Sequence, residues 1–157
     1  MLEKIEEWIH QLNASHKQVR HSCSILHDHF NGFYSIEFLK TAYFVVTDNI
    51  PKPDFPELRE AGLGNFIDMD GGGITYNDTY YIKQNAVNEL SLHFHELVHV
   101  IQYDELTQPG FIKRYIQEIQ DFGYDKAPLE NMAYGLEKHY KEKGRHINVE
   151  QFVRKNL

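Results

Sequence analysis

Apolar residues recur at helical spacing in the first thirty positions of the chain. One series begins at Leu2 and ends at Leu12, and a second begins at Val19 and ends at Phe30. In each series the apolar residues lie three or four positions apart, which places them on one face of an α-helix. The pattern therefore predicts two helices within residues 1–30.

The next segment combines a helix signal, a strand signal and a proline-rich stretch. Ser35 is a residue type that caps helices, and it precedes a short helical pattern over residues 36–41. Residues 42–47 are mostly aromatic or β-branched, which is typical of a buried strand. Residues 48–64 contain three prolines, so we expect this stretch to be a loop on the surface.

Turn signals then separate three short strand patterns. Residues 65–69 and 74–76 are predicted strands joined by a run of glycines, and residues 77–78 form a second turn into a strand over residues 79–82. We expect these strands to form a small antiparallel meander. With the strand before them, they predict a sheet within residues 42–83.

The second half of the chain has only helical patterns. Residues 86–104 contain no proline or glycine, and the helix they predict has an apolar stripe and partly apolar remaining sides. Such a helix is expected to be buried between two layers. Pro109 and Pro128 begin two further helices within residues 109–142. No repeat or linker divides the chain, so we expect a single α+β domain over residues 1–157.

Charge and composition exclude some classes of partner. The formal net charge is -7, which repels the phosphates of nucleic acids and anionic lipid. No stretch is long and apolar enough to span a bilayer, and the first residues carry no export signal. The single cysteine, Cys23, cannot form an internal disulfide, so we expect a buried small residue in a cytoplasmic protein. The sequence therefore predicts neither a nucleic-acid nor a membrane partner.

Histidine is abundant in this chain, and two of its ten histidines lie in a His-Glu-x-x-His motif. Residues four apart on a helix lie one above the other, so the imidazoles of His95 and His99 can bind a single ion. Glu96 points to one side, where it can accept a proton from a metal-bound water instead of binding the metal. The motif predicts one zinc ion per chain on the helix over residues 86–104.

A catalytic zinc ion takes three protein ligands, so the sequence must provide a third. The metzincin extension is absent, because Glu105 stands where its third histidine would lie. His93 is excluded because it points about 200° away from His95 around the helix. A later helix must then supply the ligand, and Glu130, in the first turn of the helix that Pro128 begins, is the best placed. The competing candidates are Glu118, Asp121, Glu137 and His139.

The motif at residues 95–99, followed by a downstream glutamate, resembles the gluzincin branch of the zincin metallopeptidases. The resemblance is closer to compact, largely uncharacterised bacterial proteins of that type. The residues that carry it are His95 to Gln102, Gly110-Phe111, Arg114-Tyr115, Gly123-Tyr124, Pro128 to Glu130 and Ala133-Tyr134. These residues span roughly the last half of the chain. Residues 45–51 and 73–76 show a weaker similarity. The resemblance implies a zincin-like fold, in which a small twisted, mainly antiparallel sheet packs on the active-site helix and the helical C-terminal subdomain is reduced.

The resemblance also implies hydrolysis of a peptide or protein substrate with Glu96 as the general base. An extended peptide would pair with an edge strand, and residues 73–76, just before the active helix, are the candidate. A hydrogen-bond donor must stabilise the oxyanion. Tyr134, four residues after Glu130, is the first candidate for this donor, and Tyr124 is the second.

Other polar residues near the motif and near the N-terminus have simpler interpretations. Gln102 and Tyr103 flank the histidine face and are predicted to orient the zinc ligands without binding the metal themselves. A second polar cluster fans out over several faces of the predicted N-terminal helix, which favours a solvated helix over a metal site. This cluster comprises His21, His27, His29, Cys23 and Asp28.

Two alternatives from other classes remain. A zincin-like module could bind metal, or fold without it, and catalyse nothing, because Glu96 is necessary for hydrolysis but not sufficient. A carboxylate-bridged di-iron protein would use Glu7-x-x-His10 and Glu96-x-x-His99 on facing helices. That site needs four long helices and two further glutamates, which the proline-rich and glycine-rich segments disfavour.

Overall fold

The centre of the fold is a four-stranded mixed sheet. The computed structural model describes all of residues 1–157. The strands are β1 (His21–Ser22), β2 (Tyr43–Thr47), β3 (Gly73–Tyr76) and β4 (Thr79–Lys83). Their order is β1-β2-β4-β3, so β3 lies at one edge. The pairs β1–β2 and β3–β4 are antiparallel, whereas β2 and β4 run parallel, a pairing that the predicted meander did not include.

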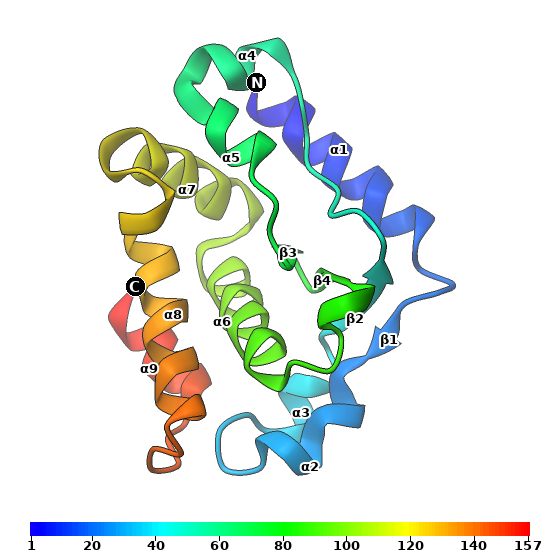
Figure 1. Cartoon of the computed structure of the whole chain (residues 1–157), viewed down its shortest axis with the longest axis vertical. Coiled ribbons are helices and arrows are strands. Elements are labelled where there is room, and N and C mark those ends of the chain that lie inside the picture. The colour runs from blue at the N-terminus through cyan, green and yellow to red at the C-terminus, as the bar shows by residue number, and fades with distance from the viewer.

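Helices pack around this sheet and make up the second half of the chain (Figure 1). They are α1 (Leu2–Ser15), α2 (His27–Phe30), α3 (Ile36–Leu39), α4 (Pro56–Leu58), α5 (Gly64–Asp68), α6 (Leu90–Leu106), α7 (Gln108–Phe122), α8 (Pro128–Lys141) and α9 (Val149–Asn156). Shorter turns are η1 (Cys23–Leu26), η2 (Arg59–Leu63), η3 (Gln84–Ala86) and η4 (Tyr124–Lys126). The fold is therefore α+β, as predicted. Judged by length and hydropathy together, none of these helices is able to cross a membrane.

The two central strands are buried on both faces. Neighbouring residues of a strand point to opposite faces of a sheet. Phe44 and Tyr80 belong to the buried cluster that includes the core residues of α6, whereas Val45 and Tyr81 belong to the cluster that includes those of α1. The side chain of Asn13 ties α1 to this second face, because it accepts a hydrogen bond from the Tyr81 hydroxyl at 2.7 Å. Burial on both faces explains the continuous apolar run that predicts β2.

Helix α6 is buried along most of its length. It contacts β3 and β4 on one side and α7 and α8 on the other, as Figure 1 shows. Every side chain from His93 to Tyr103 is buried. The expectation of a helix between two layers is confirmed. Because buried polar groups need partners, the polar side chains of this helix must find theirs inside the protein.

The predicted second helix within residues 1–30 is wrong. His21 and Ser22 form β1, which pairs with β2, and only two short helical turns follow, the 3-10 turn η1 and the four-residue helix α2. The side chain of Ser22 accepts a hydrogen bond from the backbone N–H of Ser24 and so begins the first of these turns. Pairing with the free edge of β2 is a tertiary contact, and it overrides the helical spacing of the apolar residues.

The predicted strand over residues 65–69 is also wrong, because these residues belong to α5 and the turn that ends it. The preceding proline-rich stretch, predicted as a loop, contains α4 and η2 as well. Lys52 fixes the end of α5, since its Nζ donates to the backbone oxygens of Phe66 (2.8 Å) and Met69 (2.5 Å). These carbonyls therefore bond a distant side chain and not a neighbouring strand. The hairpin of β3 and β4 is as predicted, with Asn77 at a positive φ of 60° in its turn.

The C-terminal helices combine two confirmed predictions with one that was missed. Pro109 and Pro128 lie in the first turns of α7 and α8, as predicted. The last helix, α9, was not predicted. It buries Val149 and Val153 and is capped by Asn148. Three apolar residues in eight positions are too short a pattern to identify a helix.

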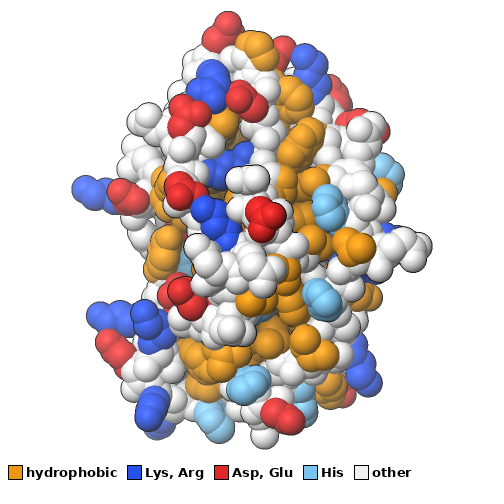
Figure 2. Space-filling view, turned by 45° about the vertical axis from the view of Figure 1, so that its right-hand side comes forward, with side chains coloured by type: hydrophobic (Ala, Val, Ile, Leu, Met, Phe, Trp, Pro, Cys, Tyr) orange, Lys and Arg blue, Asp and Glu red, His pale blue; other side chains and the backbone are white.

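The exposed surface carries charges of both signs. On the face shown in Figure 2, Lys and Arg side chains lie among Asp and Glu side chains and form no continuous basic patch. Ion pairs account for part of this mixing. Arg59, for example, lies 2.8 Å from both Asp54 and Asp68. Hydrophobic side chains also reach the surface in a broken vertical band on the same face.

Candidate metal centre

Three buried side chains each bring one potential ligand atom to the same point. His95 Nε2 and His99 Nε2 are 3.2 Å apart, and each lies 3.1 Å from Glu130 Oε1. Ligand atoms about 2.0–2.1 Å from a tetrahedral zinc ion lie about 3.3 Å from one another, so this triangle fits such an ion with little rearrangement. The group of His95, His99 and Glu130, called the triad below, can therefore hold a metal ion.

Two helices position the triad. His95 and His99 are four residues apart on α6, so their imidazoles leave the same face of the helix. Glu130 lies in the first turn of α8, where the N-terminal end of a helix favours a negative charge. All three residues are only 3–4% exposed. The structure thus brings together the three residues that the sequence predicts as metal ligands.

Each histidine is also held at its other ring nitrogen. His95 Nδ1 lies 2.9 Å from Glu137 Oε1, and His99 Nδ1 lies 2.7 Å from Gln102 Oε1. Both partners accept, so both Nδ1 atoms donate and the Nε2 atoms face the third ligand. Gln102 also donates to the backbone oxygen of Leu129 at 3.1 Å, which links α6 to the first turn of α8. Gln102 therefore has the supporting role predicted for it, and Glu137, a candidate ligand, orients His95 instead.

A hydrogen bond also fixes the second carboxylate oxygen of Glu130. The Tyr115 hydroxyl on α7 donates to Glu130 Oε2 at 2.5 Å, which leaves Oε1 facing the histidines. Burial raises the pKa of Tyr115 well above its usual value, so the hydroxyl keeps its proton and remains a donor. No role for Tyr115 is predicted from the sequence, because nothing local indicates which face of α7 meets Glu130.

Glu96 lies beside the triad but is bonded elsewhere. Thr75 Oγ1 lies 2.8 Å from Glu96 Oε1 and 3.1 Å from the backbone oxygen of the same residue. A Cβ atom at Gly73 would lie 3.3 Å from Glu96 Oε2, so the glycine leaves room for the carboxylate. Burial raises the pKa of Glu96, although the nearby His95 and His99 oppose this effect. A carboxylate that is not a ligand and has a raised pKa is suited to accept a proton.

Between themselves, the triad residues form a buried ion-pair network. Burial disfavours charge on His95, but hydrogen bonds to Glu130 and Glu137 outweigh it and raise the pKa of His95 to about 10. Burial also acts against charge on His99, but the pKa of His99 is raised because Glu130 lies beside it. In Glu130, the effect of burial is outweighed by the two histidines, which hold the pKa of this carboxyl well below its usual range. At neutral pH, the triad therefore contains the ionised carboxylate of Glu130 and the protonated imidazole of His95.

Metal binding to the triad is expected to release at least one proton and to weaken as the pH falls. Because its pKa is raised, His95 holds a proton at neutral pH, and a metal ion must displace this proton from Nε2. Because the pKa of His95 is about 10, the affinity should fall about tenfold for each unit by which the pH lies below that value. Calorimetric titration of the apoprotein in buffers of different ionisation enthalpy counts the protons released. A count of zero at neutral pH would contradict this charge state.

The other candidates for the third ligand have structural partners. Glu118 accepts a hydrogen bond from the backbone N–H of Leu129 at 2.8 Å and so caps the first turn of α8. Asp121 is exposed, and His139 lies 2.7 Å from a backbone oxygen in the loop after α8. None of these three belongs to the group that can hold an ion.

Replacing Glu118 with alanine is expected to destabilise the protein by about 1–2 kcal/mol. The residue that precedes α8 offers no side-chain cap, so the substitution leaves the buried N–H of Leu129 without an acceptor. Urea unfolding of the apoprotein measures the effect. Asp121→Ala is the matched control, because Asp121 lies on α7 like Glu118 but is exposed. Equal unfolding free energies for the two variants would show that the cap contributes nothing.

Two tyrosines lie at the rim of the site. Tyr134 is 45% exposed, and its ring centroid lies 4.4 Å from that of His95. Its hydroxyl oxygen lies 3.1 Å from that of Tyr124. One hydroxyl donates to the other, so one proton of the pair is free for another acceptor. Tyr103, predicted to support the ligands, instead stacks on Phe111 with 3.8 Å between ring centroids.

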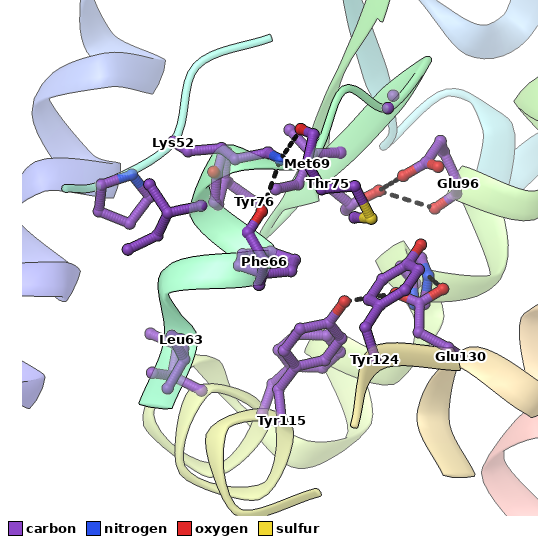
Figure 3. Close-up of a pocket in the computed structure, with 18 of the residues that line it drawn as sticks. Lys52, Leu63, Phe66, Met69, Thr75, Tyr76, Glu96, Tyr115, Tyr124 and Glu130 are labelled. Atoms are coloured by element: carbon purple, nitrogen blue, oxygen red, sulfur yellow. Dashed lines mark hydrogen bonds and ion pairs between the residues drawn. The ribbon is translucent and has the colours of Figure 1, made fainter. Parts of the chain in front are cut away.

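The triad and Glu96 line a cavity of about 390 Å³. Its wall is mostly apolar and is built from α1, residues 51–72 (called the strap below), β3, α6, α7 and α8. Figure 3 shows Tyr115 and Glu130 on one side of the cavity and Lys52 on another. The volume is within the range of about 300–1,000 Å³ that is usual for small-molecule sites.

The other histidines have different surroundings. His21 lies in β1 and His27 and His29 lie in α2, so the predicted N-terminal cluster is not on one helix. Cys23 is fully buried, as expected. His93 points away from the triad, as predicted, and its Nδ1 lies 2.6 Å from the Tyr80 hydroxyl.

The two glutamate–histidine pairs that a di-iron site would use do not lie together in the structure. Glu7 and His10 are exposed on α1, whereas Glu96 and His99 are buried in α6. Glu7 accepts a hydrogen bond from a neighbouring glutamine on its own helix. The fold also has a mixed sheet at its centre, and not the four long helices of a di-iron bundle.

The class of this protein is defined by its fold and its site. It is an α+β protein with a buried His-His-Glu group that can hold a metal ion. No protein-family model, curated protein or solved structure matches the chain. Function must therefore be argued from the site itself.

Proposed function

We propose that this protein is a zinc-dependent metallopeptidase with a zincin-like fold. The observation that carries the proposal is the buried triad with Glu96, a carboxylate outside it, in the wall of the same cavity. Two imidazoles and one carboxylate are a ligand set that suits catalytic zinc, which keeps a fourth position open. Hydrogen bonds at Nδ1 of His95, Nδ1 of His99 and Oε2 of Glu130 keep the other nitrogen or oxygen of each side chain facing the metal position.

In this proposal Glu96 is the general base. Zinc bound by the triad supplies Lewis acidity, which polarises a carbonyl group and lowers the pKa of water. Glu96 takes a proton from the attacking water and passes it to the leaving amine. Thr75 holds one oxygen of Glu96, and the space at Gly73 leaves room for the other.

The proposal assigns substrate binding to β3 and oxyanion stabilisation to Tyr134. β3 is an edge strand and its residues line the cavity, so an extended peptide can pair with its backbone. The hydroxyl of Tyr134, with Tyr124 as its hydrogen-bond partner, donates to the oxyanion.

Metal content and peptide cleavage test the proposal together. Protein purified without added metal is expected to contain about one zinc ion per chain and to cleave members of a mixed peptide library. Chelation should abolish the cleavage, and added zinc should restore it. A protein that holds zinc and leaves the library intact would support a catalytically inert zincin-like module. Uptake of paired iron ions would support the di-iron alternative.

A further inference from the structure

Lys52 is the one lysine or arginine in the wall of the cavity that contains the triad. Its ammonium group has three N–H donors. Two of them bond the backbone oxygens of Phe66 and Met69, at 2.8 and 2.5 Å. The third donor has no hydrogen-bond partner in the protein, and the ammonium also lies over the Phe66 ring, 5.0 Å from the ring centroid. Figure 3 shows the Lys52 side chain extending along the cavity towards Met69.

The positive charge of Lys52 is not paired with a carboxylate. Two aspartates in the strap affect its pKa, but Asp70 forms an ion pair with Lys83 and Asp68 forms one with Arg59. Burial, the largest effect, lowers the pKa of Lys52. A partly buried cation in an apolar wall gains free energy from an anionic partner. The cavity can therefore take a ligand that carries a negative charge.

The shape of the cavity limits how much of a ligand lies inside it. Ile5 and Ile9 of α1 and Ile112 of α7 line one side and are only 5%, 1% and 5% exposed, so that side is closed to solvent. The exposed lining residues are Asp70, Asp125 and Tyr134, and the cavity is open to solvent where they lie. The part of a substrate that enters the closed side must be short and apolar.

We propose that Lys52 binds the terminal carboxylate of a peptide substrate whose last side chain is large and apolar. This inference rests on the proposed metallopeptidase function and names its substrate class. The apolar side chain fills the closed side of the cavity, and the carboxylate accepts the third N–H of Lys52. Water then adds to the carbonyl carbon of the last peptide bond, the C–N bond breaks, and the last residue leaves as a free amino acid with the proton on its amine.

Binding of two matched hydroxamates tests the inference without turnover. Each compound carries a hydroxamate, which binds zinc, followed by a phenylalanine residue that ends in a free carboxylate in one compound and in an amide in the other. Calorimetry with zinc-loaded wild-type protein is expected to show about tenfold tighter binding of the free acid, because a charge-assisted hydrogen bond to Lys52 is then formed. Zinc content, measured on the same samples, shows whether the proposed metal site is occupied.

Two lysine variants identify the residue responsible. Lys52→Met should remove the preference for the free acid, and Lys113→Met, at an exposed position of α7 outside the cavity, should keep it. Lys52 also bonds the backbone of Phe66 and Met69, so urea unfolding must show that Lys52→Met is folded. If this variant is unfolded, the comparison of the two compounds on wild-type protein decides the inference. Equal wild-type affinities for the two compounds would overturn the Lys52 inference alone. Failure of both compounds to bind zinc-loaded protein would overturn the metallopeptidase proposal with it.

Discussion

Replacing Glu130 with glutamine is expected to abolish tight zinc binding while the protein stays folded. Glutamine has the same size and can still accept the hydrogen bond that Tyr115 donates. Its neutral amide, however, is a much poorer zinc ligand than the carboxylate, which lies 3.1 Å from the Nε2 atoms of both His95 and His99. The loss of affinity should be the largest of any substitution outside the two histidines.

Glu137→Gln is the matched control for this prediction. Glu137 is a carboxylate on the same helix that bonds His95 on the side away from the triad. Loss of such a supporting group typically lowers metal affinity by about 10–100-fold, so the Glu130 variant should lose more than this. Competition with a chromophoric zinc chelator measures both affinities. A Glu130→Gln variant that bound zinc as tightly as the wild type would show that another residue is the third ligand.

The parts of the site that the sequence predicts depend on local spacing. His95 and His99 lie on one face of α6 because they are four residues apart, and this holds wherever the helix packs. Glu130 follows from a similar local signal, because Pro128 marks the first turn of α8. The convergence of the two helices was an inference from the number of ligands that catalytic zinc needs. The structure places the three ligand atoms within bonding range of one ion.

The supporting contacts of the site could not be predicted in the same way. Tyr115 reaches Glu130 from α7, and Thr75 reaches Glu96 from β3, across 15 and 21 positions of the chain. Such contacts depend on how helices and strands pack, and no periodicity in the sequence indicates them. Gln102 is predicted as a support because it flanks the histidine face of the same helix, and it bonds His99 three residues away.

The errors in the predicted fold have the same physical origin. Residues 21–22 follow a helical pattern but pair with the edge of β2. Residues 65–69 follow a strand pattern but form most of α5 and the turn after it, whose carbonyls bond Lys52. In both places a tertiary hydrogen bond outweighs a weak local preference. The cavity follows from these same segments, because the strap and α1 form much of its wall. The shape of the cavity could therefore not be predicted from the sequence.

Replacing Glu96 with glutamine is expected to lower peptide hydrolysis by about 10²–10⁴-fold while zinc remains bound. The amide cannot take a proton from water, but its oxygen can still accept the hydrogen bond from Thr75, so the fold around it should not change. Glu89→Gln, at an exposed position just before α6, is the matched control and should keep wild-type activity. A Glu96→Gln variant with normal zinc content and normal cleavage would show that another group is the base.

The same substitution is expected to make the apoprotein more stable at neutral pH. Burial raises the pKa of Glu96, so folding favours the protonated form, and the charged form that prevails at higher pH costs free energy. Wild-type protein therefore loses stability relative to the glutamine variant as pH rises above the pKa of the unfolded carboxyl, and the difference vanishes in acid, where the group is protonated in both states. Urea unfolding of the two apoproteins across this pH range measures the difference. A gain in stability together with a loss of hydrolysis is what a buried carboxylate kept for catalysis should show. A loss of stability at neutral pH would mean that Glu96 has a structural role in the core of α6.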